Sequence, residues 1–268
     1  MASNCGLYAY GLVDRSPEAL DIVGIDQHSK VFPVAGHASC VMVSEIDVDT
    51  FQQQVKQQFS VLTGIAEGIH QGVTMLLQAH EDVVDTLMQG STVVPFQFGT
   101  VLKDKAAALK MLQEGEERFK NLLDKFAGRA EWGLKVYVDQ PEFMQHIVHT
   151  EPEFQKLVAQ REGLSKGVAY LLGRKMEEEL KEQALARQAE VCEAIFLQFG
   201  NLAYERKLNQ PQKLTGKKKE MLLNAVYLVE KAQGTAFCQQ REHLMEYYSS
   251  MGLDLEVSGP WPPYSFIV

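Results

Sequence analysis

Residues 131–138 alternate apolar and other side chains with a period of two. The apolar members are Trp132, Leu134, Val136 and Val138. This period is typical of a half-buried β-strand and excludes an amphipathic helix. The preceding stretch, 104–127, repeats its apolar residues at three- and four-residue steps and ends before Gly128, as a helix does. We therefore predict that a new domain begins near residue 129.

The length and composition agree with two folded domains. The chain has 268 residues, 46% of them apolar and 23% charged, which is ordinary globular usage and excludes a wholly disordered chain. We predict an α+β protein with domains at 1–128 and 129–268.

The first domain is predicted to be a small antiparallel sheet with helices. Residues 7–13, 31–34, 38–43 and 92–98 have strand character, whereas 51–59 and 73–87 follow a helical period. Pro33 indicates that its strand lies at a sheet edge, and Pro95 indicates an edge or a bulge, because proline has no N–H for a neighbouring strand.

The second domain is predicted to follow a β-α-β-α-β order. After the strand at 131–138 comes a long helical segment at 164–208, then an apolar run at 221–229 of strand or helix type. A helix at 235–250 and a strand at 253–257 complete it, and helices packed on one face of a small sheet suit this order.

Charge is distributed unevenly. Residues 1–100 hold three basic and eleven acidic side chains, a net −8, although the whole chain carries only −9. This acidity argues against a nucleic-acid partner. The sequence shows no membrane-spanning run, secretory signal or paired-cysteine motif, so we expect a soluble, intracellular protein with reduced, buried cysteines.

The motifs of catalysis and cofactor binding are missing. Residues 214–218 (LTGKK) lack the first glycine of a phosphate-binding loop, and no Gly-x-Ser-x-Gly elbow occurs. His146 and His149 are too few ligands for a metal site. We expect no enzyme activity, no metal, no cofactor and no small-molecule substrate.

Two segments remain as candidate protein-binding sites, one in each domain. Their candidate residues are Pro95, Phe96, Gln97 and Phe98 in the first domain and Trp261, Tyr264 and Phe266 in the proline-rich tail. For the tail we also weigh the alternative that it covers the sheet of its own domain, because exposed aromatic tails favour aggregation.

Several pieces of the chain, in order, resemble the gas vesicle protein F/L family (GvpF/GvpL). They are residues 7–11 (LYAYG), His80, 94–100 (VPFQFGT), 131–136 (EWGLKV), 167–171 (GVAYL), 222–229 (LLNAVYLV) and 259–266 (GPWPPYSF). One departure is Gln97, where many relatives carry a basic residue.

The resemblance implies an accessory or minor structural role in assembling the gas vesicle, a protein-walled buoyancy organelle in the cytoplasm. The implied partners are the small hydrophobic shell protein GvpA and other accessory proteins, with no membrane, and the implied second domain is ferredoxin-like. We expect GvpA to contact the first domain. A generic adaptor and an enzyme with an unrecognised site are the alternatives.

Overall fold

The protein is described by a computed structural model, which covers residues 4–16, 21–62, 70–150, 152, 155, 156, 159, 166–212 and 219–267. The chain divides into two compact units. Unit 1 is Met1–Ala130 together with Trp261–Val268, and unit 2 is Glu131–Pro260. The end of the chain therefore belongs with unit 1, whereas the sequence assigned it to the second domain. Charge and periodicity could not reveal this, because neither says which surface an aromatic segment will cover.

Unit 1 is built on an antiparallel sheet. Its strands are β1 (Cys5–Val13), β2 (Phe32–Ala35), β3 (Cys40–Asp47), β4 (Val93–Pro95) and β5 (Val101–Leu102). The order is β2-β3-β1-β4, and β5 also pairs with β1. The predicted antiparallel sheet and the edge positions of the strands that hold Pro33 and Pro95 are confirmed. Of the predicted strand 92–98, the structure has only Val93–Pro95 as strand β4.

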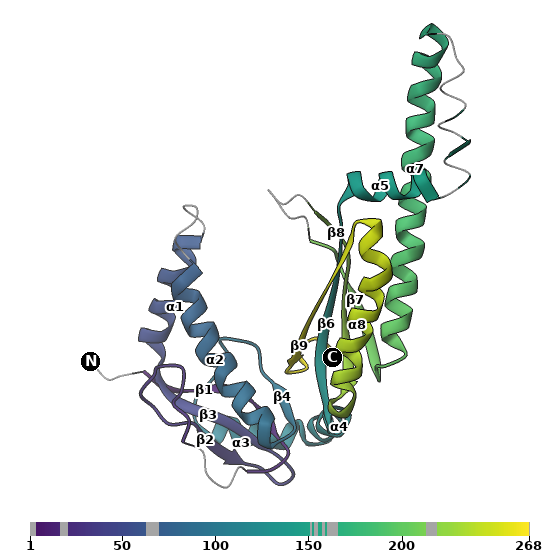
Figure 1. Cartoon of the computed structure of the whole chain (residues 1–268). Helices are drawn as coiled ribbons and strands as arrows, with labels where there is room; N and C mark the ends of the chain where they lie inside the picture. The colour runs from purple at the N-terminus through teal and green to yellow at the C-terminus, as the bar shows by residue number, and fades with distance from the viewer. Residues whose placement is uncertain are drawn as a thin grey trace. The chain divides into compact units, whose positions relative to one another are not determined.

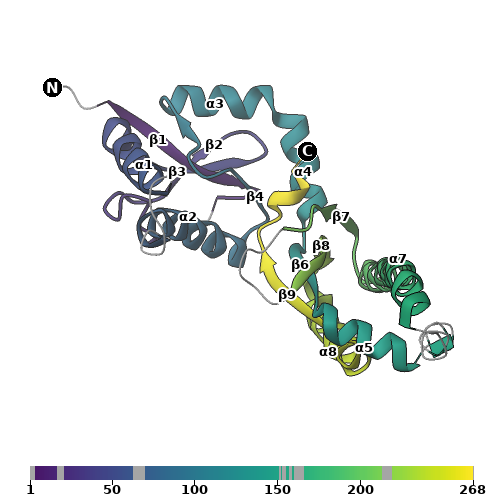
Figure 2. The same ribbon diagram turned by 90° about the horizontal axis from the view of Figure 1, so that it is seen from above.

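The helices of unit 1 lie on both faces of this sheet (Figure 2). They are α1 (Val48–Leu62), α2 (His70–Gly90), α3 (Lys105–Glu114) and α4 (Glu116–Phe126). Asp104 begins α3 by accepting a hydrogen bond from the Ala107 N–H at 2.8 Å. The sequence predicted one helix across 104–127, but Gly115 separates two. Glycine has a low helix propensity, and the Phe119 ring occupies the space that a side chain at Gly115 would need.

Unit 2 has a four-stranded sheet with order β7-β8-β6-β9. Its elements, coloured teal to yellow in Figure 1, are β6 (Arg129–Val138), α5 (Gln140–Thr150), α7 (Lys166–Gly200), β7 (Glu205–Asn209), β8 (Glu220–Glu230), α8 (Gly234–Tyr248) and β9 (Leu253–Trp261). Short 3₁₀ turns are η1 (Lys231–Gln233), η2 (Ser249–Met251) and, in the unit 1 tail, η3 (Tyr264–Phe266). This is the β-α-β-β-α-β order of ferredoxin-like folds.

The ferredoxin-like expectation is thus confirmed, but with one strand more than the sequence indicated. The helical segment predicted at 164–208 ends at Gly200, and residues 205–209 form the edge strand β7 instead. Helix α5 was not predicted from the sequence either. The pairing of β7 with β8 decides its conformation, because five residues with three charged side chains carry little strand signal of their own.

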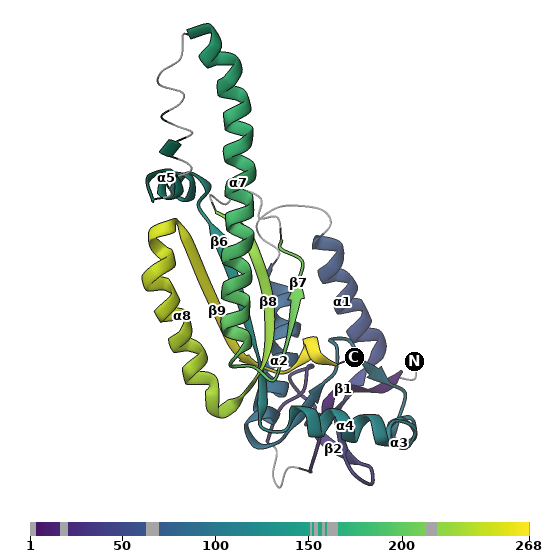
Figure 3. The same ribbon diagram turned by 90° about the vertical axis from the view of Figure 1, so that its right-hand side faces the viewer.

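The core of unit 2 lies between the sheet and the helices α7 and α8, which cover the same face (Figure 3). The predicted alternation of β6 is confirmed: Trp132, Leu134, Val136 and Val138 are all buried in this core. Facing them, the rings of Phe199 on α7 and Phe237 on α8 lie 4.7 Å apart between centroids.

Other sequence expectations have mixed outcomes. None of the four cysteines forms a disulfide, but only Cys40 is buried: Cys192 is half-buried, and Cys5 and Cys238 are exposed, because they lie at the start of β1 and on the outer side of α8. Residues 214–218 lie outside the described residues. The neighbouring Lys219 forms an ion pair with Asp254 at 3.1 Å.

Candidate functional site

The seven candidate site residues all belong to unit 1, but most of them are packed inside it. Pro95 and Phe266 are buried, and Phe96, Phe98 and Tyr264 are half-buried. Only Gln97 and Trp261 are exposed, Trp261 at 46%. The structure brings Phe98 and Tyr264 together at one buried side chain, His80 of helix α2.

His80 is the centre of a hydrogen-bond network that joins three parts of unit 1. Its Nδ1 lies 3.0 Å from the Tyr8 hydroxyl of β1. Its Nε2 lies 3.0 Å from the Tyr264 hydroxyl of the tail. The Tyr8 hydroxyl also accepts a hydrogen bond from the Gly99 N–H at 3.0 Å. Strand, helix and tail are thereby held together by one imidazole.

The network settles the protonation of its members. Burial lowers the pKa of His80 to about 4, and a hydrogen bond to the Phe96 backbone opposes this shift only in part, so the imidazole is neutral at pH 7. The Tyr8 hydroxyl accepts from the Gly99 N–H and keeps its own proton to donate, an arrangement that suits the imidazole tautomer with its proton on Nε2. The Tyr264 hydroxyl can then donate to Glu81, whose pKa is raised by burial although this bond opposes the rise.

Aromatic rings pack around His80. The Tyr8 ring lies 5.0 Å from Tyr10 and 5.3 Å from Phe51 between centroids, and the Phe98 ring lies 6.0 Å from His80. The Tyr10 hydroxyl has partners of its own: it accepts from the Ile25 N–H at 2.7 Å and meets the Ser44 hydroxyl at 2.8 Å. The hydroxyls of both tyrosines are thus hydrogen-bonded within the aromatic core of unit 1.

The end of the tail is fixed at a second place. Phe266 is fully buried, and its carbonyl accepts a hydrogen bond from the Lys125 ammonium at 3.3 Å. The same ammonium lies 5.7 Å from the centre of the Phe266 ring, a distance that suits a cation–π contact. Residues 264–266 therefore complete the core of unit 1, and Trp261 is the exposed aromatic residue of the tail.

Sequence analysis missed the roles of Tyr8, Tyr10 and Glu81 and gave none to His80. A signal was present in β1, where Tyr8 and Tyr10 point to one face and carry polar groups that need partners when buried. The partners could not be identified, because His80 and Tyr264 are far from β1 in the sequence.

The described residues contain neither a candidate metal site nor a candidate membrane span. Within the described ranges, no three His, Cys, Asp or Glu side chains are placed to share a metal ion. No described helix is both long enough and apolar enough to cross a membrane.

These features define a two-unit α+β protein whose aromatic tail closes the first unit. Its fold is similar to that of proteins of known structure. The crystal structure of the gas vesicle protein GvpF from Anabaena sp. PCC7120 matches with a TM-score of 0.71 and 24% identity over 98% of both chains. That of GvpF from Microcystis aeruginosa matches with a TM-score of 0.67 and 21% identity, over 98% of this chain and 99% of the other.

Sequence comparison gives the family. Residues 6–268 match the family described as gas vesicle synthesis protein GvpL/GvpF. Gas vesicle protein L of Streptomyces sp. (strain CB03234) is 29% identical over 70% of this chain and 67% of its own length. Gas vesicle protein F of Nostoc sp. (strain PCC 7120) is 25% identical over 97% of both. The chain belongs to the GvpL/GvpF family, and its role is in gas vesicle formation.

Proposed function

We propose that this chain is a cytoplasmic accessory and minor structural protein that binds the gas vesicle shell protein GvpA during nucleation or growth of the vesicle. Family membership over residues 6–268 supports the vesicle role. The proposal assigns the chain no catalytic step. Other accessory proteins of the vesicle are further proposed partners.

The observation that carries the proposed contact is the pair of edge strands of unit 1. Strands β2 and β4 end the sheet order, and Ala35 of β2 and Gln97 beyond β4 are exposed. A shell subunit that assembles through strands has unpaired edges before assembly, and another protein can cover them by pairing with its own edge. The net −8 of residues 1–100 would favour cationic groups on the partner.

Co-expression with GvpA tests this contact. The tagged full-length chain is purified beside two matched variants, Ala35→Asp on the β2 edge and Ala236→Asp on the exposed side of α8 in unit 2. A charge on an edge strand opposes strand pairing. We expect the first variant to retain several-fold less GvpA and the second to retain as much as the unchanged protein.

Other results would redirect the proposal. A folded full-length chain that retains no GvpA would contradict the shell-binding role and favour a generic adaptor. Loss of GvpA in Ala236→Asp alone would move the contact to unit 2. Circular dichroism of each variant establishes that its fold is intact.

A further inference from the structure

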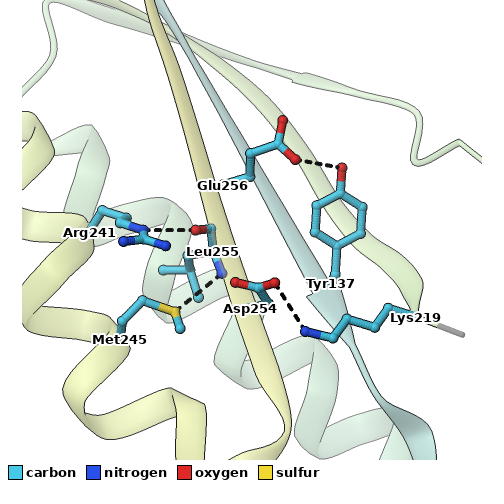
Figure 4. A network of polar contacts seen from close by, with 7 residues as sticks. All are labelled: Tyr137, Lys219, Arg241, Met245, Asp254, Leu255 and Glu256. Atoms are coloured by element: carbon cyan, nitrogen blue, oxygen red, sulfur yellow. Dashed lines mark hydrogen bonds and ion pairs between the residues drawn. The ribbon is translucent and has the colours of Figure 1, made fainter.

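The edge strand β9 of unit 2 is partly closed by side chains of α8 (Figure 4). The Leu255 N–H donates to the Met245 sulfur at 3.3 Å, and the Leu255 carbonyl accepts from Arg241 Nε at 2.9 Å. These two side chains take the place of a neighbouring strand. At Leu255, therefore, no further strand can pair with β9.

Two residues further along β9, the backbone has the same orientation. In an antiparallel pair, alternate residues direct their N–H and C=O groups toward the partner strand and away from it. The Asp139 N–H donates to the Gly252 carbonyl at 2.9 Å. The even-numbered residues of β9 therefore direct their backbone N–H and C=O groups toward β6. Val257 therefore directs its backbone groups outward, as Leu255 does, and no described side chain caps them.

A pocket of about 360 Å³ opens at this place, between β9 and α8. It is lined by Val257 and Gly259 of β9, Cys238 and Arg241 of α8, and Trp132 of β6. Such a volume is enough for a few residues of peptide. Trp132 is only 7% exposed, and its indole N–H has no hydrogen-bond partner among the described residues.

We propose that this pocket binds a short extended peptide segment of a partner protein, which pairs with β9 at Val257 as an added strand. The segment supplies one N–H and one carbonyl to Val257, and further carbonyls satisfy the remaining Arg241 donors. A small apolar side chain contacts Trp132. Because Met245 and Arg241 already bond the Leu255 backbone, the segment can pair only with the C-terminal end of β9 and must be short.

The chemistry of the pocket favours a peptide backbone over a small anion. Arg241 is accompanied by the carboxylates of Glu242 and Glu256 in the lining, so a free anion meets no net positive charge. A backbone offers donors and acceptors in the alternation that an edge strand requires. This binding surface is independent of the GvpA contact proposed for unit 1.

Nuclear magnetic resonance of the full-length chain tests the proposal, because the protein contains only two tryptophans. The indole N–H signals of Trp132 and Trp261 are assigned with Trp261→Phe. The probe is an acetylated and amidated pentapeptide of alternating threonine and valine, and its backbone N-methylated twin is the control. We expect a saturable shift of the Trp132 signal, no shift of Trp261, and at least tenfold weaker binding of the twin.

Two variants locate the contact. Val257→Pro removes the outward N–H at an edge position, where proline is tolerated, and should weaken binding at least tenfold. Val257→Thr keeps that N–H and should bind like the unchanged protein. No Trp132 shift at millimolar peptide, or equal binding of the N-methylated twin, would overturn the proposal. If Val257→Pro unfolds, the difference in binding between the peptide and its N-methylated twin, measured on the unchanged protein, still tests the proposal.

Discussion

Among single residues, His80 determines most about unit 1, because it joins β1 and the tail while remaining uncharged. Its imidazole is fully buried, and its two nitrogens meet Tyr8 and Tyr264. A buried neutral histidine makes folding sensitive to acid, since its pKa is lower in the folded chain than in the unfolded chain, and acid therefore stabilises the unfolded chain.

We predict that unit 1 loses stability as the pH falls from 7 to 5. The pKa of His80 is 6.5 in an ordinary environment and about 4 here, so its contribution is complete above 6.5 and lost as the pH falls toward 4. Between pH 7 and 5 the loss is about 2 kcal/mol. Burial raises the pKa of Glu81 and Asp85, and their protonation offsets part of this loss. Urea denaturation at each pH measures it.

The matched variant is His80→Asn, which cannot titrate in this range. It should be less stable than the unchanged protein at pH 7, and this difference should shrink at pH 5. An equal difference at both values would show that protonation of His80 does not govern the acid sensitivity.

Glycine 252 allows a close approach within unit 2. Its φ is +71°, and a Cβ atom there would lie 2.7 Å from Glu142 Cβ and 3.0 Å from the Phe143 nitrogen. We predict that Gly252→Ala destabilises unit 2 by about 2 kcal/mol or more, from left-handed strain plus this clash.

Two other glycines separate the effect of left-handed strain from that of the steric clash. At Gly99, φ is +87° with open space around it, so Gly99→Ala should cost about 1 kcal/mol from strain alone. Gly90 has ordinary φ and open space, so Gly90→Ala should be neutral or slightly stabilising. Thermal unfolding ranks the three variants, and a harmless Gly252→Ala would contradict the structural account.

At the scale of elements, the tail behaves as part of the core of unit 1. We predict that Phe266→Ala destabilises unit 1 by about 3–5 kcal/mol through the cavity it leaves. Tyr264→Phe should cost about 1–2 kcal/mol, because it leaves His80 and Glu81 short of one partner. Hydrogen exchange should rise in α2 and α4 and stay unchanged in α8.

A chain that ends at Ser258 distinguishes a structural tail from a partner-binding one. We expect circular dichroism to show loss of structure in unit 1, with loss of GvpA as a consequence. Trp261→Ala removes the exposed aromatic residue alone. If that variant folds normally but no longer retains GvpA, the tail also contacts the partner.

Elements differ in how well the sequence predicted them. The strand at 131–138 and the helix at 235–250 have clear periods, and the structure has β6 and α8 there. Strand β7 was missed because its conformation comes from pairing with β8. The helix at 104–127 was predicted as one, since a single glycine among good helix formers does not show whether the axis breaks.

At the scale of the whole molecule, unit 2 is an insertion in unit 1. The chain leaves unit 1 after Ala130 and returns at Trp261, and a Cβ atom on Gly259 would lie only 2.9 Å from the Glu131 carbonyl oxygen. The exit and the return are therefore side by side, and a short connection can join them.

We predict that unit 1 folds without unit 2 only when it keeps its tail. Residues 4–130 joined to 261–268 by a three-glycine linker should give cooperative thermal unfolding, whereas residues 4–130 alone should be markedly less stable, because they lack buried Phe266 and the Tyr264 bond. Equal stability of the two proteins would show that the tail adds nothing to unit 1.

The sequence by itself determined the α+β class, most strands and helices, the edge positions of Pro33 and Pro95, and the family resemblance. Periodicity achieves this because it reports which face of an element is apolar. Only the tertiary structure decided that the tail belongs to unit 1, that His80 is buried and neutral, and that α8 plugs one position of the β9 edge. These depend on contacts between residues far apart in the chain. A pattern of apolar and polar residues shows which face of an element will be buried, but not which distant segment will pack against that face.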